Sequence, residues 1–255
     1  MSSLRGMRGL LRRQGAPAPL EEPEIPRIAA DPDEPPLAFD REAGDLWRAR
    51  LLSVLFDHYA GVPLYKFPED LRVYEHLLWA GRVDTVIELG TAAGGSALWF
   101  ADRLRTFRDH GRCAGATVVT VDIDATDVRA NVGDRRDIRL LEGDILDPAL
   151  PARIEAELPR DARCLVVEDG PHTFEATSAA LTGFSRFVPV GGWFVVEDGV
   201  VDEEELRIGD EWPRGVQRAV KSWLASPAGE GFRLRRDFEA YGITTNPGGY
   251  LQRTS

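Results

Sequence analysis

Two apolar runs that each end in acidic residues decide the fold of this chain. The first is Cys164-Leu-Val-Val-Glu-Asp-Gly-Pro-His172, and the second is Trp193-Phe-Val-Val-Glu-Asp198. Runs of β-branched and aromatic residues that stop at carboxylates are typical of buried strands in a parallel sheet. The Ala-rich segment between them, Phe174–Phe187, has the composition of a crossover helix. Because a strand–helix–strand unit makes its two strands parallel neighbours, the sequence predicts an α/β fold.

Three carboxylates follow these strands: Asp169 after the first, and Glu197 and Asp198 after the second. Open α/β sheets bind ligands outside the carboxyl ends of their strands, so the three acids are expected to meet there. Carboxylate oxygens suit a hard divalent cation, although acids at strand ends also cap helices and hold loops. His172 titrates near neutrality and is a candidate general base; the alternative is a histidine that satisfies a buried backbone group.

A glycine-rich turn follows an earlier strand, Asp84–Leu89. The turn reads Gly90-Thr-Ala-Ala-Gly-Gly-Ser96 and leads into a helical segment, Ala97–Phe107. Glycines allow the backbone to approach a ligand closely, and the helix N-terminus offers free N–H groups. The spacing differs from the Gly-x-Gly-x-x-Gly dinucleotide fingerprint, and no Gly-Lys-Ser/Thr follows, so a P-loop is excluded.

The next two predicted strands also end in acids. Ala116–Ile123 carries Asp122 near its end, where α/β cofactor folds hold the hydroxyls of a ribose. Ile138–Ile145 carries Gly143-Asp144 at the corresponding place. The sequence therefore predicts a nucleoside-containing cofactor over the glycine turn and these strand ends.

The rest of the chain extends this core at both ends. Residues 1–36 are rich in proline and lack apolar periodicity, so we expect a disordered or extended arm. One domain then covers 37–255, with a helical cap over 37–82 and a Rossmann-like core over 83–255. The cap is predicted to contain helices at Asp45–Tyr59 and Glu69–Ala80.

Downstream of the second acidic pair, residues 199–214 form an acidic stretch that is either a lid or a solvated surface. A helix is predicted at Val216–Ala225. Three β segments follow, at Phe232–Phe238, Tyr241–Thr245 and Gly249–Arg253, and give a hairpin-like antiparallel finish.

The composition excludes several classes of protein. A formal net charge of −11 argues against binding to nucleic acid, because an acidic surface repels a polyanion. No apolar run approaches the length of a membrane-spanning helix, so no membrane partner is expected. The two cysteines form no paired motif, which favours a reducing, cytoplasmic location.

Taken together, these motifs resemble a class I S-adenosylmethionine-dependent methyltransferase. More narrowly, the chain resembles the cephalosporin hydroxylase and rhamnosyl O-methyltransferase family, to which macrolide-sugar O-methyltransferases are related. The resemblance rests on seven motifs over about residues 60–251: Gly61-Val-Pro63, Pro68-Glu-Asp70, Glu88–Ser96, Val121-Asp-Ile-Asp124, Asp169-x-x-His172, Val196-Glu-Asp198 and Thr245-Asn-Pro-Gly-Gly-Tyr250.

The resemblance implies a doubly wound, mostly parallel seven-stranded sheet with a C-terminal antiparallel hairpin. It also implies Mg²⁺ held by Asp169, Glu197 and Asp198, with His172 as the general base. Glu168 beside Asp169 leaves open which of the two faces the metal. The positions that the family implies for S-adenosylmethionine are Glu88, Gly90, Thr91, Gly94, Ser96, Asp122 and Asp144.

The function expected on these grounds is an S-adenosylmethionine- and Mg²⁺-dependent O-methyltransferase. Its expected partner is a small hydroxylated natural product, with a sugar as the first choice, and a homo-oligomer is left open. Two alternatives remain: a metal-independent methyltransferase acting on nitrogen, carbon or a carboxylate, and a silent family member that only binds the cofactor.

Overall fold

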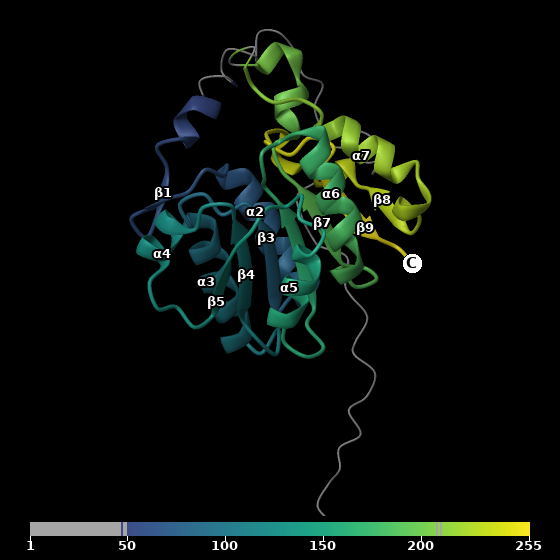
Figure 1. Cartoon of the computed structure of the whole chain (residues 1–255). Helices are drawn as coiled ribbons and strands as arrows, with labels where there is room; N and C mark the ends of the chain where they lie inside the picture. The colour runs from purple at the N-terminus through teal and green to yellow at the C-terminus, as the bar shows by residue number, and fades with distance from the viewer. Residues whose placement is uncertain (1–46, 48–49, 208, 210) are drawn as a thin grey trace, which may run out of the picture.

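A seven-stranded sheet forms the centre of the computed structural model, which describes residues 47, 50–207, 209 and 211–255 (Figure 1). The predicted arm at 1–36 lies outside the described residues. The strands follow the order β5-β4-β3-β6-β7-β9-β8. Five of them are parallel: β3 (Thr85–Leu89), β4 (Thr117–Asp122), β5 (Ile138–Glu142), β6 (Cys164–Glu168) and β7 (Trp193–Val196). β8 (Phe232–Leu234) and β9 (Tyr250–Arg253) complete the sheet as antiparallel strands.

The chain runs outward from β3 in both directions, first through β4 and β5 and then through β6 and β7. The crevice at this reversal, between β3 and β6, is where open α/β sheets bind their ligands. The predicted doubly wound, mostly parallel sheet with an antiparallel finish is confirmed. In register, Leu89 at the end of β3 lies beside Glu168 at the end of β6, which brings the glycine turn next to Asp169.

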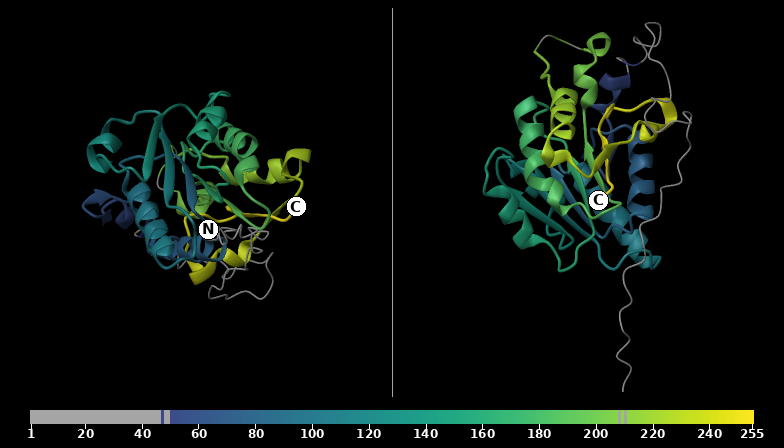
Figure 2. Two further views of the ribbon diagram at one scale, coloured as in Figure 1. Left: turned by 90° about the horizontal axis from the view of Figure 1, so that it is seen from below. Right: turned by 90° about the vertical axis from the view of Figure 1, so that its right-hand side faces the viewer.

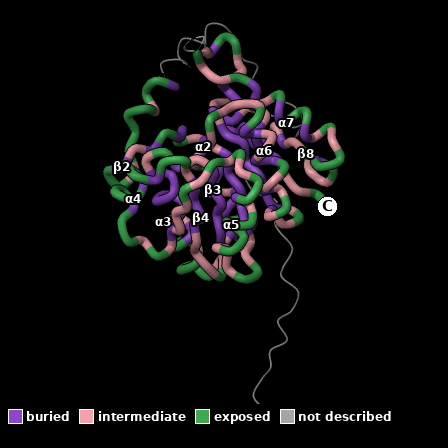
Figure 3. The backbone as a smooth tube through the Cα atoms, in the orientation of Figure 1, coloured by how far each residue is buried: buried purple, intermediate pink, exposed green. Residues whose placement is uncertain are grey.

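Helices cover both faces of the sheet (Figure 2). Successive strand residues point to opposite sides, and apolar residues on each side pack against the helices there. Val86 packs on the face covered by α2 (Pro68–Ala80), α3 (Gly95–Asp109) and α4 (Thr126–Val132). Ile87 packs on the other face, against α5 (Leu150–Glu157), α6 (Phe174–Phe184) and α7 (Val216–Leu224). The residues of the central strands are therefore buried, and their tube is purple in Figure 3.

The structure corrects three boundaries. The helix predicted at Asp45–Tyr59 is helical at 50–54, but His58–Tyr59 forms β1, which pairs with β2 (Val62–Pro63). Tyr241–Thr245 is not a strand; the partner of β9 is β8, and a 3₁₀ turn occupies Ala240–Gly242. The strand predicted at Phe232–Phe238 ends at Leu234.

Tyr241–Thr245 is kept out of the sheet by buried hydrogen bonds that Asp70 of α2 accepts. Asp70 accepts hydrogen bonds from Thr245 N at 2.9 Å and Tyr250 Oη at 2.9 Å. Thr244 Oγ1 donates to the same carboxylate at 2.5 Å. These bonds hold the segment before β9 against α2, so it cannot pair with a strand.

No helix in the described part of the chain combines the length and the apolar character needed to cross a bilayer. Among the same residues, Cys113 and Cys164 are both free, and Cys164 is buried at the start of β6.

Candidate active site

A cavity of about 600 Å³ lies at the carboxyl ends of the parallel strands. Gly90, Asp122 and Asp144 line it on the side of β3, β4 and β5. Asp169, His172 and Asp198 line it on the side of β6 and β7. One cavity is therefore lined both by residues predicted to bind the cofactor and by residues predicted to bind the metal or act as the base.

Apolar residues from two distant segments form the remaining walls. Leu51 and Val54 come from the helical residues 50–54, and Val200 and Trp212 come from the acidic stretch. Leu51 and Val200 belong to one small apolar cluster with Phe67 and Leu206, so the two segments support each other. The two segments lie at the same end of the molecule in Figure 1.

The acidic stretch is held by its own arginine. Arg207 donates hydrogen bonds to the carbonyl oxygens of Val201 at 2.8 Å and Trp212 at 2.7 Å. This part of 199–214 is thus a wall of the cavity rather than only a solvated surface.

On the cofactor side, Asp122 is fixed by the glycine turn. Its Oδ2 accepts hydrogen bonds from Thr91 N and Ala92 N, each at 2.9 Å, and Oδ1 accepts one from Asp124 N at 3.2 Å. A carboxylate oxygen has more than one lone pair, so Asp122 can still accept hydrogen bonds from cavity ligands. Asp144 is fixed similarly, because its Oδ1 accepts a hydrogen bond from Leu146 N at 2.9 Å.

Gly90 lines the cavity and has a second role that the sequence did not indicate. Its φ is +100°, and a Cβ atom built on it would lie 1.9 Å from the carbonyl oxygen of Asp169. The missing side chain therefore allows the turn to approach the end of β6, not only a ligand. Gly94, with φ +96°, is the N-cap of α3, and a Cβ there would lie 2.9 Å from Val132 Cγ2.

Three side chains predicted to bind the cofactor lie behind the cavity wall, and Gly94 is likewise buried and absent from the cavity lining. Glu88, Thr91 and Ser96 are buried and are not among the residues that line the cavity. Thr120 Oγ1 donates to Glu88 Oε2 at 2.6 Å and lies 2.5 Å from Thr91 Oγ1. Burial raises the pKa of the Glu88 carboxyl to about 7. Direct contact between these three side chains and the cofactor stays a prediction.

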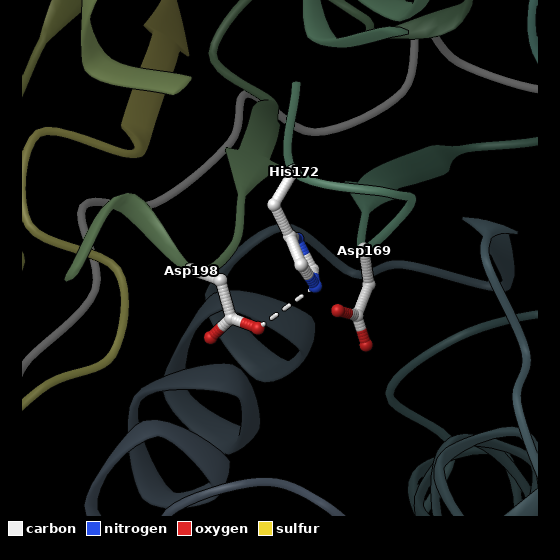
Figure 4. A group of neighbouring side chains, drawn as sticks. All are labelled: Asp169, His172 and Asp198. Atoms are coloured by element: carbon white, nitrogen blue, oxygen red, sulfur yellow. Dashed lines mark ion pairs between the residues drawn. The ribbon is translucent and has the colours of Figure 1, made fainter. Parts of the chain in front are cut away.

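On the other side, Asp169, His172 and Asp198 form a compact cluster (Figure 4). Each offers one ligand atom, and these atoms all lie within 4.8 Å of one another. His172 Nε2 lies 3.2 Å from Asp198 Oδ2. His172 and Asp198 adopt positive φ values of 55° and 54°, which non-glycine residues rarely do. Strain of this kind gathers at functional sites, where the surrounding structure enforces it.

Charges within the cluster shift its pKa values. Burial lowers the pKa of His172, but the carboxylates of Asp198 and Asp169 raise it more, so the net shift is upward. Burial raises the pKa of Asp169, but the charge of Lys66 opposes this and the net shift is downward. An ionised Asp169 beside an imidazole is a suitable donor set for a hard cation and a base.

Glu197, predicted as a third acidic ligand, has other partners. Its Oε2 lies 2.5 Å from Lys66 Nζ, and its Oε1 accepts a hydrogen bond from Tyr74 Oη at 2.5 Å. Lys66 Nζ also donates to Asp169 Oδ2 at 2.8 Å. Both carboxylate oxygens of Glu197 are therefore engaged, and Lys66 links Glu197 to Asp169 of the cluster. A ligand role for Glu197 stays a prediction, and it would require an ion to replace Lys66 or Tyr74 at one of these oxygens.

The structure also decides between the two neighbouring acids at the end of β6. Glu168 is fully buried and accepts hydrogen bonds from Thr177 Oγ1 of α6 at 3.1 Å and from Gly170 N at 3.2 Å. Burial raises the pKa of Glu168 to about 7. Asp169 lines the cavity, so it and not Glu168 faces the candidate metal position.

Two residues that support the acidic side of the site, Tyr74 and Asn246, were not identified from the sequence. Asn246 is fully buried, and its Oδ1 accepts a hydrogen bond from Asp198 N at 3.1 Å. This bond supports the strained backbone of Asp198. Asn246 and Asp70 both lie within motifs that carried the family resemblance, but their spacing alone gives no sign of these contacts.

Comparisons with known proteins give a family match and a fold match. A family model described as "Rhamnosyl O-methyltransferase/CmcI" matches residues 54–254. A rhamnosyl O-methyltransferase of Mycobacterium tuberculosis (strain ATCC 25618 / H37Rv) is 24% identical over 198 residues, which cover 76% of this chain and 77% of that protein.

Solved structures share the fold at lower identity. The structure "cmcI-D160 Mg-SAM" matches with a TM-score of 0.55 and 20% identity, covering 92% of this chain and 90% of that one. MycE methyltransferase from the mycinamycin biosynthetic pathway, in complex with Mg and SAH, matches with a TM-score of 0.50 and 16% identity, covering 82% of this chain and 55% of that one.

Proposed function

The chain belongs to the rhamnosyl O-methyltransferase/CmcI family, and we propose that it uses Mg²⁺ to methylate a hydroxyl of a small natural product. Membership makes it an S-adenosylmethionine-dependent O-methyltransferase at the level of the family. The cation, the acceptor and the role of each residue are the proposal. The observation that carries it is the cluster of Asp169, His172 and Asp198 in the same cavity as Asp122.

S-adenosylmethionine fits the cofactor side of the cavity. We assign the ribose hydroxyls to Asp122, whose carboxylate accepts hydrogen bonds and is already oriented by two amides of the turn. Asp144 would lie near the adenine. The methyl group would then face the acids on β6 and β7, because the two halves meet at the reversal between β3 and β6.

Asp169 and Asp198 would hold Mg²⁺, since their oxygens suit a hard cation. When bound, the ion supplies a Lewis acid that lowers the pKa of the acceptor hydroxyl. His172 takes the hydroxyl proton, and Asp198, whose Oδ2 lies 3.2 Å from His172 Nε2, stabilises the imidazolium that forms. The acceptor oxygen forms a bond to the methyl carbon as the carbon–sulfur bond breaks, and S-adenosylhomocysteine leaves.

The apolar wall has a supporting role. Leu51, Val200 and Trp212 restrict the entry of water and align the acceptor for the in-line displacement. We propose a sugar hydroxyl as the first acceptor to test, because the family description and the mycobacterial relative both name a rhamnosyl group.

A metal-independent methyltransferase is the second candidate. The observation that favours it is Lys66, whose ammonium already pairs with both Asp169 and Glu197.

Calorimetric titration with S-adenosylhomocysteine, with and without Mg²⁺, tests the cofactor half of the proposal. We expect saturable binding in both conditions; no binding in either would contradict the cofactor assignment. The metal half is tested by measuring methylation of rhamnose-bearing acceptors before and after treatment with a chelator. Loss of turnover that Mg²⁺ restores supports the proposal, and a full rate in chelator favours the metal-independent candidate.

A further inference from the structure

Lys66 lies in an unusual position for a lysine. Its side chain is 3% exposed, in the segment that links β2 to α2. Nζ lies 2.8 Å from Asp169 Oδ2 and 2.5 Å from Glu197 Oε2, and Glu197 is also 3% exposed. A buried ammonium is tolerated only when it is paired, and here two carboxylates share it.

The choice of lysine is itself informative. Only two of the 31 Lys and Arg residues are lysines, Lys66 and Lys221, so this chain uses arginine almost everywhere else. A guanidinium is planar and broad, whereas an ammonium is a compact point charge. At Lys66 a compact positive charge therefore lies between two of the three acids that the sequence predicted as metal ligands.

This position affects any divalent ion at the neighbouring cluster. Lys66 occupies Asp169 Oδ2, and Asp169 belongs to the cluster with His172 and Asp198. An ion that binds Asp169 would meet a positive charge on the same carboxylate. Like charges only a few ångströms apart repel strongly where water is excluded. Lys66 also engages Glu197, which could otherwise add a negative charge to the ion's surroundings.

We propose that Lys66 is a built-in counter-cation that competes with the divalent ion for Asp169 and Glu197 and thereby sets the cation affinity of the site. Lys66 is then a positioning residue, because it fixes one oxygen of Asp169 and one oxygen of Glu197. This inference rests on the proposed cation site. A purely structural lysine, which ties its loop to the sheet, would leave cation affinity unchanged.

The test is direct binding of Mn²⁺ to the full chain, measured by calorimetry in parallel with thermal unfolding. We expect Lys66→Met to bind Mn²⁺ at least about tenfold more tightly than the wild type, because a repelling charge is removed and Glu197 is released. Mn²⁺ should also raise the melting temperature of Lys66→Met more than that of the wild type. Lys221→Met is the matched control, because Lys221 is exposed on α7, and it should bind Mn²⁺ like the wild type.

A double variant separates charge from structure. Lys66→Met combined with Glu197→Gln removes one charge of each sign, so its Mn²⁺ affinity should return toward that of the wild type. Lys66→Arg keeps the positive charge and should not gain affinity. S-adenosylhomocysteine binding in each variant reports whether the cavity is intact.

The outcomes separate the two proposals. If the wild type binds Mn²⁺ and Lys66→Met binds it equally or more weakly, the role proposed for Lys66 is overturned. The proposed cation site is not affected by that outcome. Absence of Mn²⁺ binding in every variant would overturn the proposed cation site as well. If Lys66→Met stays unfolded at all Mn²⁺ concentrations while the double variant folds, the proposed competition between Lys66 and the ion is also overturned. Lys66 would then serve only to compensate the charge of Glu197.

Discussion

The two sides of the cavity lie on one edge of one sheet but are built by different interactions. The cofactor side consists of the glycine turn with Asp122 and Asp144, and backbone amides only 30 and 31 residues away hold Asp122. The acid side consists of Asp169, His172 and Asp198 with their partners Lys66 and Glu197. Its central contacts join residues 103 and 131 positions apart and involve full charges.

This difference predicts how each side responds to mutation. Hydrogen bonds between a carboxylate and backbone amides can be lost one at a time at a modest cost. Removing one of two buried charges that compensate each other costs much more, because its partner is left unpaired. We therefore expect changes on the acid side to affect chemistry severely and changes on the cofactor side to affect mainly affinity.

The largest effect is expected for Asp169→Ala. Turnover should fall by about a thousandfold or more, because the variant lacks a cation ligand and one of the two carboxylate partners of Lys66. The affinity for S-adenosylhomocysteine should change by less than about threefold, since Asp122 and the turn are untouched. Turnover and calorimetry on the same preparation measure both. An exposed control, Asp109→Ala, should match the wild type; equal losses of turnover and cofactor affinity in Asp169→Ala would break the division into two sides.

A smaller loss is expected for His172→Gln. Removal of a general base costs about 10²- to 10⁴-fold in turnover. If His172 is the base, Mn²⁺ affinity should stay close to that of the wild type. A parallel loss of Mn²⁺ affinity would show instead that the imidazole is a ligand of the ion. The exposed His110→Gln serves as the control.

On the cofactor side, Asp122→Ala should raise the dissociation constant for S-adenosylhomocysteine by about 10- to 100-fold. This is the value of one hydrogen bond to a charged group, or slightly more. Turnover at saturating S-adenosylmethionine should fall much less, and Mn²⁺ affinity should not change. A variant that loses kcat but keeps its affinity would contradict the role assigned to Asp122.

The smallest effect concerns the contacts that support the acid side from behind. Burial raises the pKa of Asp70 from 3.8 to about 6, against the opposing hydrogen bonds from Thr244, Thr245 and Tyr250. The folded chain thus binds this proton more tightly than the unfolded chain, and stability is lost as pH rises from 3.8 to about 6. The full loss is roughly 3 kcal/mol, and roughly half of it falls above pH 5.

Asp70→Asn cannot titrate and should lack this loss. Denaturant unfolding at pH 5 and pH 7.5 should show that the wild type loses roughly 1.4 kcal/mol more than the variant between the two pH values. An exposed control, Asp109→Asn, should follow the wild type. Equal pH dependence in the wild type and Asp70→Asn would mean that the buried carboxylate is not protonated at pH 5.

Much of the architecture was predictable because its signals are local. Apolar runs such as Cys164–Glu168 and Trp193–Val196 identify buried strands by composition alone, and the crossover helix between them makes them parallel. The acid that follows each strand then lies at the carboxyl edge of the sheet whatever its neighbours are. This is why Asp122, Asp169 and Asp198 could be assigned to one edge from their positions in the sequence.

The partners of those acids were decided only by the tertiary structure. Which of two adjacent acids faces the cavity depends on the face of the strand, and Glu168 turns toward Thr177 of α6. The sequence motif pairs Glu197 with Asp198, but Lys66 and Tyr74 take its oxygens from 131 and 123 residues away. Beyond the strand ends no periodicity constrains a side chain, so its direction follows from the local φ and ψ and from whichever charge packs against it.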